Sequence, residues 1–342
     1  MPWSRHLHDI LGHLKRGGQL EPGGLPKHDG RLDLRGAPFP QPRERDGVTF
    51  SSPELPYDYL ATTIEGKFKV ENVQIEDADF STALMDNTDW RRCVFRRARF
   101  SRASLRDCAF TACHFEDVSF EGADLRGALL GGYAAHDTNE FRRTAFPRSD
   151  LRDTAYRYPL FEDCDFSRAK LDKVDFEGSR FSRCRFSGKM IEVWFRGFYS
   201  RPHPRDLDYF KRLEIDSSRI RNPMVDVDFS EAYLDDVMFV DEIDLSHCRF
   251  PQDEKHIVIG NRQGVYSAME RTIDSQWHGA ARVESLEFLR QLRERSEKKS
   301  QLMDVINRET YEADRSVAEL WSRAFFDLLQ DLARRGPKDG VK

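Results

Sequence analysis

The chain has 342 residues, and its 54 Lys+Arg against 59 Asp+Glu give a net charge of −5. This near balance excludes a strongly basic nucleic-acid binder, so any charged partner must meet a local patch. The 25 Phe exclude a disordered chain. No apolar run approaches the ~18 residues that cross a bilayer, and the start, MPWSRHLHDILGHLKRGG, lacks a signal-peptide core, which predicts a cytoplasmic protein with no membrane contact.

Residues 1–70 form the first predicted segment. It opens with an amphipathic stretch, expected to be a short helix. Leu34 and Phe39 then lie five residues apart, and Phe50, Leu55 and Leu60 continue that spacing. We expect this segment to cap the lower end of the fold described next, where open strand edges would otherwise pair with other chains.

Residues 71–250 contain a repeat of five residues. A large apolar residue stands at every fifth position from 75 to 130, with a small residue two positions before it. After GGYAAHDTNE at 131–140 the spacing resumes from Phe141 to Phe186 and Ile191, and a shorter block runs from 229 to 250. The large residues of the first block are Ile75, Phe80, Met85, Trp90, Phe95, Phe100, Leu105, Phe110, Phe115, Phe120, Leu125 and Leu130.

A period of five fits neither a continuous helix nor a continuous strand, so the chain must turn every five residues. Within a unit, an extended step points the small and the large residue inward, and the other three positions face water. One unit cannot bury its apolar face alone. The units must therefore wind into coils and stack, as in a solenoid.

The outward charges indicate how many units make one coil. If four units close a coil, residue i lies beneath residue i+20, about 4.8 Å away. At this offset fifteen residue pairs have opposite charge and three have like charge, whereas an offset of fifteen residues gives nine against eight. Four units per coil are therefore predicted. Phe95 should then stack on Phe115, and Arg96 should lie between Glu76 and Glu116.

Segments such as CVFRR, ARFSR, ASLRD, CHFED, VSFEG and ADLRG resemble the pentapeptide-repeat proteins. The resemblance covers about 71–250 and implies an all-β solenoid, a right-handed quadrilateral β-helix. We expect about seven coils with insertions at 131–140 and 192–223. Asn139, Pro159 and Lys189 depart from the pattern, because they occupy the small inward position.

Catalytic, cofactor and metal sites are not predicted. No nucleotide-binding, zinc-protease or nucleophile-elbow motif occurs, and an almost wholly apolar interior offers no place to tune a catalytic group. The cysteines all fall at the small inward position, which favours buried reduced thiols over zinc ligands or disulfides. These cysteines are Cys93, Cys108, Cys113, Cys164, Cys184 and Cys248.

The insertion at 192–223 places aromatic rings among arginines, the residue types enriched at binding hot spots. Loops of this length in a compact domain are usually functional or disordered. The rings either bind a protein partner or fold back over the side of the coil. The candidate partner-binding residues here are Trp194, Phe195, Phe198, Tyr199, Tyr209 and Phe210.

An acidic stretch follows, in which Arg249 is the sole base between 226 and 250. Unlike the repeats before it, this stretch is expected to lack stacked counter-charges. It is either a solvated face or a docking site for a basic partner. Its candidate residues are Asp226, Asp228, Glu231, Asp235, Asp236, Asp241, Glu242 and Asp244.

Residues 251–342 change to helical apolar spacing. One amphipathic stretch contains Leu286, Leu289 and Leu292, a second contains Leu302, Val305 and Ile306, and a third runs from 320 to 332. These helices are expected to cover the top coil. The alternative is a homodimer interface through Trp321 and Phe325.

The sequence thus predicts a non-enzymatic scaffold that binds another, unidentified protein through the aromatic insertion and the acidic end. The resemblance implies an alternative, because some pentapeptide-repeat proteins mimic DNA, bind type II topoisomerases and protect DNA gyrase. Such mimicry needs a continuously acidic flank, and only 191–250 is strongly acidic. Direct nucleic-acid binding is not expected, because carboxylates are predicted above or below Arg96, Arg97 and Arg99.

Overall fold

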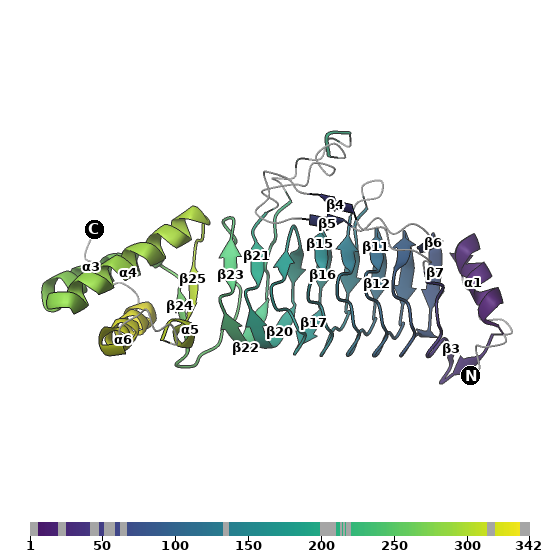
Figure 1. The fold of residues 1–342 in the computed structure, drawn as a ribbon, viewed down its shortest axis with the longest axis horizontal. Helices are drawn as coiled ribbons and strands as arrows, with labels where there is room; N and C mark the ends of the chain where they lie inside the picture. The colour runs from purple at the N-terminus through teal and green to yellow at the C-terminus, as the bar shows by residue number, and fades with distance from the viewer. Residues whose placement is uncertain are drawn as a thin grey trace. The chain divides into compact units, whose positions relative to one another are not determined.

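The computed structural model describes residues 6–19, 25–41, 48–50, 59–61, 67–132, 137–198, 210–212, 214, 216, 220–312 and 319–335. The chain forms two compact units, Met1–Lys170 and Leu171–Lys342. The first consists mainly of short strands, and the second continues with strands and then helices (Figure 1).

The first unit starts with a helix, and its strands are two to four residues long. Its elements are α1 (Leu7–Arg16), β1 (Gly18–Gln19), β2 (Lys27–His28), β3 (Arg31–Asp33), β4 (Val48–Phe50), β5 (Tyr59–Ala61), β6 (Phe68–Glu71), β7 (Val73–Glu76), β8 (Ala78–Asp79), β9 (Thr88–Arg91), β10 (Val94–Arg96), β11 (Ala109–Thr111), β12 (His114–Glu116), β13 (Leu129–Gly131), β14 (Glu140–Arg142), β15 (Ala155–Arg157), β16 (Leu160–Glu162) and β17 (Asp165–Ser167).

Parallel pairing confirms the coil of twenty residues. β10 pairs with β7 below and β12 above, so Phe95 lies between Ile75 and Phe115. The rings of Phe95 and Phe115 are 5.0 Å apart with 4° between their planes. A second sheet runs β6, β9, β11, β13, β15, and single bridges such as Leu84–Ser104 and Asp79–Arg99 form the other two faces. The cross-section therefore has four sides.

The corners between the faces use the left-handed backbone region. Positive φ angles recur every fifth residue, as at Asp77, Thr82, Asn87, Arg92 and Arg97, with values between 50° and 59°. This conformation bends the chain sharply at a single residue, which is why a five-residue unit can form one side of a square.

The first insertion lengthens one coil. Phe115 pairs with Phe141, and their rings are 4.6 Å apart, so the stack continues across the insertion. Asn139 is fully buried: its Nδ2 donates to the carbonyl of Phe110 at 2.8 Å, and its Oδ1 accepts from the amide of Cys113 at 2.8 Å. Asn139, which occupies a position where the repeat has a small apolar residue, thus connects the end of the insertion to the coil beneath it by hydrogen bonds.

The N-terminal segment contributes to the same core. Leu34 and Phe39 are buried, and the Phe39 ring lies 5.9 Å from that of Phe68. β3 pairs with β8 of the first repeats, and α1 buries Ile10 and Leu14. Phe50, Leu55 and Leu60 continue the five-residue spacing in the sequence. Phe50 and Leu60 belong to the antiparallel strand pair β4–β5, whereas Leu55 lies outside the described residues.

The predicted charge ladder forms on two faces. Arg96 lies 3.1 Å from Glu76 and 3.3 Å from Glu116, and Arg106 lies 2.7 Å from Asp86. Arg99 bridges Asp79 of the coil beneath, as the spacing of twenty predicts, but the two side chains form no ion pair, because Asp79 accepts the backbone N–H of Ser81 at 2.9 Å. Within the described ranges Arg99 has no ion pair.

The second unit contains the remaining coils and a helical module, which we define as residues 256–335. Its elements are β18 (Asp175–Phe176), β19 (Arg180–Ser182), β20 (Arg185–Ile191), β21 (Trp194–Arg196), β22 (Asp228–Asp235), β23 (Met238–Val240), β24 (His256–Ile259), α3 (Arg262–Gln276), α4 (Gly279–Lys298), β25 (Asp304–Asn307), α5 (Arg308–Glu312) and α6 (Glu319–Arg335).

One coil of this unit is a residue short, which corrects the expected inward position of Ile191. The left-handed corners fall at Arg183, Gly188 and Glu192, so the last of these units has four residues, and Met190 is buried in place of Ile191. Phe195 then stacks on Phe176, nineteen residues earlier, at 5.1 Å. Lys189, which sequence spacing placed inward, is exposed with its ammonium 5.8 Å from the Tyr233 ring centre.

The helical module has its own core. Helices α3, α4 and α6 pack together beside the antiparallel pair β24–β25 (Figure 1). The expected second helical stretch is wrong: Val305 and Ile306 belong to strand β25, and Leu302 is 52% exposed. Trp321 and Phe325 are buried in this core, so they are not free to form the alternative dimer interface.

Candidate functional site

Two of the predicted partner-binding aromatic residues are core residues. The ring of Phe195 lies between those of Phe176 and Phe239, at 5.1 and 5.3 Å. Phe210 is 3% exposed. The short coil explains Phe195, because it moves the inward position onto this residue.

Trp194 and Phe198 are half-buried and each lies under a cation. The Lys299 ammonium is 4.2 Å from the Trp194 ring centre, and the Arg221 guanidinium is 4.6 Å from that of Phe198. Phe198 and Arg221 also form an antiparallel bridge, which closes the base of the loop 199–220. Tyr199 and Tyr209 lie outside the described residues.

The expectation that the acidic stretch lacks counter-charges is wrong. Its partners come from the coil below, the edge of the insertion and the helical module. The ion pairs are Asp228–Arg249 at 3.2 Å, Glu231–Arg185 at 2.5 Å, Asp241–Arg196 at 3.3 Å, Glu242–Arg221 at 3.8 Å, and Asp236–Arg295. Asp226 and Asp244 are exposed, and neither has an ion pair in the described part of the chain.

The end of the acidic stretch docks the chain's own helical module. The Thr310 hydroxyl donates to Asp235 at 2.6 Å, and Arg295 donates to Asp236. The backbone amides of Asp241 and Glu242 donate to the carbonyls of Lys299 and Ser300 at 3.1 and 2.9 Å. We call these four pairs the docking contacts.

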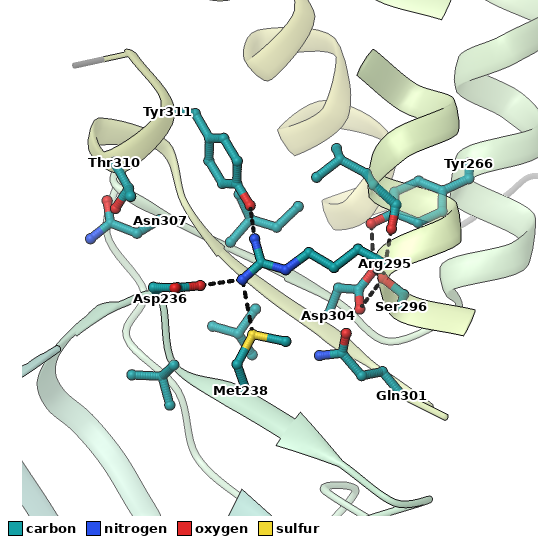
Figure 2. Close-up of a pocket in the computed structure, with 14 residues that line it drawn as sticks. Asp236, Met238, Tyr266, Arg295, Ser296, Gln301, Asp304, Asn307, Thr310 and Tyr311 are labelled. Atoms are coloured by element: carbon teal, nitrogen blue, oxygen red, sulfur yellow. Dashed lines mark hydrogen bonds and ion pairs between the residues drawn. The ribbon is translucent and has the colours of Figure 1, made fainter. Parts of the chain in front are cut away.

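A cavity of about 180 Å³ lies among the docking contacts (Figure 2). Arg295 reaches across it from α4: its Nη1 donates to the Tyr311 hydroxyl at 2.9 Å, and its Nη2 lies 3.1 Å from the Met238 sulfur. Since Nη2 also donates to Asp236, one guanidinium joins the last coil to both α4 and α5.

Asp304 also lines the cavity, together with Arg295 and Asp236, and it is 4% exposed. The hydroxyls of Tyr266 and Ser296 both donate to its carboxylate, the latter at 2.8 Å (Figure 2). Burial raises the pKa of the Asp304 carboxyl, although these hydrogen bonds oppose the rise. Burial likewise raises the pKa of Tyr311. Tyr266, Ser296 and Asp304 all belong to the helical module, so these hydrogen bonds stabilise the module itself, whereas Arg295 links the cavity to Asp236 of the last coil.

A histidine adds a further contact between module and coil. His256 is 4% exposed, and its Nε2 accepts the backbone N–H of Leu234 at 2.9 Å. Nδ1 must therefore carry the proton, which it donates to Asp253 at 2.9 Å. Sequence reasoning missed His256, Arg295 and Asp304, because no spacing links them to the residues that they contact.

No metal or cofactor site emerges from the residues that the structure describes: they contain no group of three or more His, Cys, Asp or Glu side chains able to hold a metal ion. The six cysteines form no disulfide among the described residues. Burial raises the pKa of Cys108 to about 12, so its thiol stays neutral. Among the described helices, none is long and apolar enough to span a membrane.

The comparisons with known proteins address the repeats. The sequence model of the pentapeptide-repeat family matches in eight copies, over residues 74–111, 93–132 and 158–188. A search of curated proteins found no significant match.

Solved structures similar to this chain are pentapeptide-repeat proteins. Rfr23 from the cyanobacterium Cyanothece 51142 is 14% identical, with 41% of this chain and 88% of that chain covered and a TM-score of 0.21. HetL of Nostoc sp. strain PCC 7120, involved in heterocyst differentiation regulation, is 13% identical, with 54% and 90% covered and a TM-score of 0.20. QnrB1, a plasmid-mediated fluoroquinolone resistance protein, is 15% identical, with 50% and 84% covered and a TM-score of 0.21.

The matched segments coincide with the stacked coils. Their five-residue units, left-handed corners and paired rings follow the same residues that the family model matches. Residues 74–132 and 158–188 therefore carry pentapeptide repeats, and the helical module follows these repeats in the chain.

Proposed function

We propose that this protein is a non-enzymatic scaffold that binds another protein through the segment 199–220 and through Asp226 and Asp244, which have no ion pair among the described residues. This proposal is carried by the fixed ends of the segment: Phe198 and Arg221 form a bridge, and Phe195, three residues before Phe198, is buried in the core. A rigid base lowers the ordering cost of binding.

The described interior supports a scaffold over an enzyme. It is filled by aromatic and aliphatic side chains, and its deepest polar groups, such as Asn139 and Thr88, are hydrogen-bonded within the coil. Asp226 and Asp244 are the acids of the proposed partner surface, because the others in that stretch contact the chain itself. They favour a partner with a basic segment at the contact.

The alternative, a DNA mimic that binds a type II topoisomerase, has less support. It requires a free acidic flank, whereas most of the acidic stretch pairs with arginines or docks the helical module. The likeness to QnrB1 extends to the fold alone. The experiment described next therefore tests whether a topoisomerase is the partner.

The test is cross-linking and mass spectrometry of partners captured by the full chain and by two variants. The first replaces 199–220 with a short Gly/Ser linker and leaves Phe195 and Phe198 in place. The second carries Asp226→Asn and Asp244→Asn. A matched control carries Asp86→Asn and Asp150→Asn, which neutralises two acids of the first unit.

We expect the partner to be lost with the loop replacement, weakened by the 226/244 variant and kept by the control. Loss of a topoisomerase specifically with the 226/244 variant would favour DNA mimicry. An unchanged set of bound proteins in both variants would reject the proposed surface.

A further inference from the structure

The cavity around Arg295 contains a buried carboxylate without a counter-charge. Asp304 is 4% exposed, and its carboxylate accepts hydrogen bonds from the hydroxyls of Tyr266 and Ser296, which are both neutral groups. In the described part of the chain Asp304 forms no ion pair. A carboxylate taken out of water loses hydration that neutral donors replace only in part, so a cation beside Asp304 would be stabilised.

Two arginines act on Asp304 through their charges, but neither pairs with it. Arg295 turns its guanidinium to Asp236 and to the Tyr311 hydroxyl, and Arg262 forms no ion pair among the described residues. Burial raises the pKa of Asp304, and the charges of Arg262 and Arg295 offset only part of that rise. Since Asp236 already balances Arg295, the lining of the cavity keeps an excess of negative charge.

Gln301 contributes a second polar group that is not satisfied. It is 6% exposed and lines the same cavity, yet its side-chain amide has no hydrogen bond within the described ranges. Figure 2 shows this amide pointing into the space between Met238 and Asp304. A buried amide oxygen without a donor costs free energy. One ligand group that donates to both Gln301 and Asp304 would satisfy the two together.

The size and the remaining walls of the cavity suit a short aliphatic chain. Its volume is about 180 Å³, and a cavity of about 150 Å³ already admits a molecule as large as benzene. Apolar surface in the same lining comes from Val237, Met238, Leu292 and Val305. The fitting ligand therefore combines a cationic head that donates hydrogen bonds with an aliphatic tail of about four carbons.

We propose that this cavity binds a free, short alkylamine, whose ammonium group donates hydrogen bonds to the Asp304 carboxylate and to the Gln301 amide oxygen. The aliphatic tail then lies along Met238 and Val305. The excess negative charge disfavours an anion, and an alcohol of the same length leaves that charge unbalanced. The site is distinct from the segment 199–220 of the proposed partner surface.

The ligand is a free molecule because of where the cavity is exposed. Asp236 and Arg295 are its more exposed side chains, at 42% and 36%, whereas Gln301 and Asp304 are buried. A small amine passes the Asp236–Arg295 pair on its own. A lysine side chain of another protein would have to bring its main chain against that pair.

The first experiment titrates the full chain at neutral pH with n-butylamine, 1-butanol and butyrate, and follows binding by ligand-observed NMR. The amine is expected to bind at least about tenfold more tightly than the alcohol, because hydrogen bonds to charged groups are the stronger ones. Butyrate is expected not to bind. Equal affinities of amine and alcohol, tighter binding of butyrate, or no binding of the amine at the highest concentration at which the chain stays folded would overturn the proposal.

Methyl NMR of the full chain with isotope-labelled methionine locates the amine. The Met238 signal, assigned with Met238→Leu, is expected to shift as the amine binds. The signal of Met269, which is buried in the core of the helical module and does not line the cavity, is expected to stay. An unshifted Met238 signal at saturating amine would reject the site.

Three variants test the two polar groups. Asp304→Asn removes the charge and is expected to abolish the preference for amine over alcohol. Gln301→Leu removes the amide at similar size and should weaken amine binding about threefold. The matched control is Asp274→Asn, which removes a carboxylate of α3 that is 58% exposed and should leave binding unchanged.

An unaltered preference for the amine in folded Asp304→Asn would contradict the proposal. Should this variant fail to fold by circular dichroism, Gln301→Leu decides together with the Met238 signal. Amine binding that Gln301→Leu leaves unchanged would then overturn the assignment.

A blocked lysine, Nα-acetyl-lysine N-methylamide, tests the choice of a free amine. It carries the same ammonium group on a butyl chain, with main chain attached. Weaker binding than that of n-butylamine supports a free molecule. Equal or tighter binding would overturn that choice in favour of a lysine side chain of another protein.

Discussion

The coils of the first unit and the helical module of the second hold their charges in different ways. In the coils, ion pairs recur between stacked units, as from Glu76 to Arg96 to Glu116 at a spacing of twenty residues, and the side chains of these two pairs are 36–41% exposed. In the module, Arg295 pairs with Asp236 across 59 residues, and Asp304 accepts from Tyr266 across 38. An ion pair of the charge ladder has similar ion pairs in the coils above and below it. The contacts of Arg295 have no such counterparts.

The difference indicates where each region is vulnerable. Exposed ladder pairs contribute only ~0–1 kcal/mol each, so the coils depend on their stacked interior. The stability of the module depends on a few buried polar groups. When one of them is removed, its hydrogen-bond partner is left unsatisfied.

The largest expected effect comes from the interior of the coils. Phe115→Ala removes a ring stacked between Phe95 and Phe141 at 5.0 and 4.6 Å, and should lower the free energy of unfolding by about 3–5 kcal/mol. Urea denaturation measures this loss. Leu84→Ala is the control, since Leu84 is 54% exposed, and it should change stability by less than about 0.5 kcal/mol. Equal losses in the two variants would contradict the stacked core.

The second effect tests the docking contacts. Arg295→Met keeps much of the side-chain length but removes the donors to Asp236 and Tyr311, and should cost about 1–3 kcal/mol. Hydrogen exchange should rise in β23 and β25. Arg290→Met, on the same helix, removes only exposed pairs with Glu287 and Glu294 and should cost less than about 1 kcal/mol. An equal rise of hydrogen exchange in β23 and β25 in the Arg295→Met and Arg290→Met variants would contradict the role of Arg295 in the docking contacts.

The third effect concerns the ladder. Arg96→Gln removes two ion pairs and should cost about 0.5–1 kcal/mol at low salt, a loss that about 1 M salt screens away. Arg99→Gln is the matched control, because Arg99 has no ion pair among the described residues, and it should leave stability unchanged at either salt concentration. A loss in Arg96→Gln that salt does not reduce would show that the ladder does not act through charge.

The smallest expected effect is on how stability changes with pH: the carboxyls of the coils and the Asp304 carboxyl of the module should change the free energy of unfolding in opposite directions. Hydrogen bonds from Arg143 lower the pKa of Glu116 and Asp117, so the folded coils bind fewer protons there than the unfolded chain. That stabilisation is present above the ordinary carboxyl pKa, about 4, and is lost as the pH falls through the lowered values. Burial instead raises the pKa of Asp304, so its contribution falls as the pH rises from about 4 through the raised value.

Two variants measure these opposite trends by urea denaturation between pH 3 and 7. Relative to the wild type, Asp304→Asn should gain stability as the pH rises, whereas Arg143→Gln should lose it. Parallel curves for Asp304→Asn and the wild type would mean that the Asp304 carboxyl keeps its ordinary pKa on folding.

Sequence reasoning predicted the coils well for a physical reason. Each repeat contacts only its neighbours, so a register set by Phe95 and Phe115 extends along the stack without further information. It failed where the repeat is interrupted. The unit between the corners at Gly188 and Glu192 has four residues instead of five, and this one missing residue converts Phe195 from a candidate contact residue into a core residue.

The candidate site was predicted less well. The aromatic and acidic residues were chosen for composition, yet Trp194, Asp235, Asp236 and Asp241 contact groups of their own chain that no periodicity connects to them. Arg295 carried no signal, because on an exposed amphipathic helix it looks like any other charged residue.

The five-residue repeat and the spacing of opposite charges were enough to predict the four-sided coil, its twenty-residue register and the inward rings, because each unit can bury its large residue only against the units above and below it. Which charged side chains lack an ion pair could be learned only from the folded structure. Arg99 and Asp244 remain without ion pairs among the described residues while Asp236 is paired, since ionic partners depend on distances between segments that are remote along the chain.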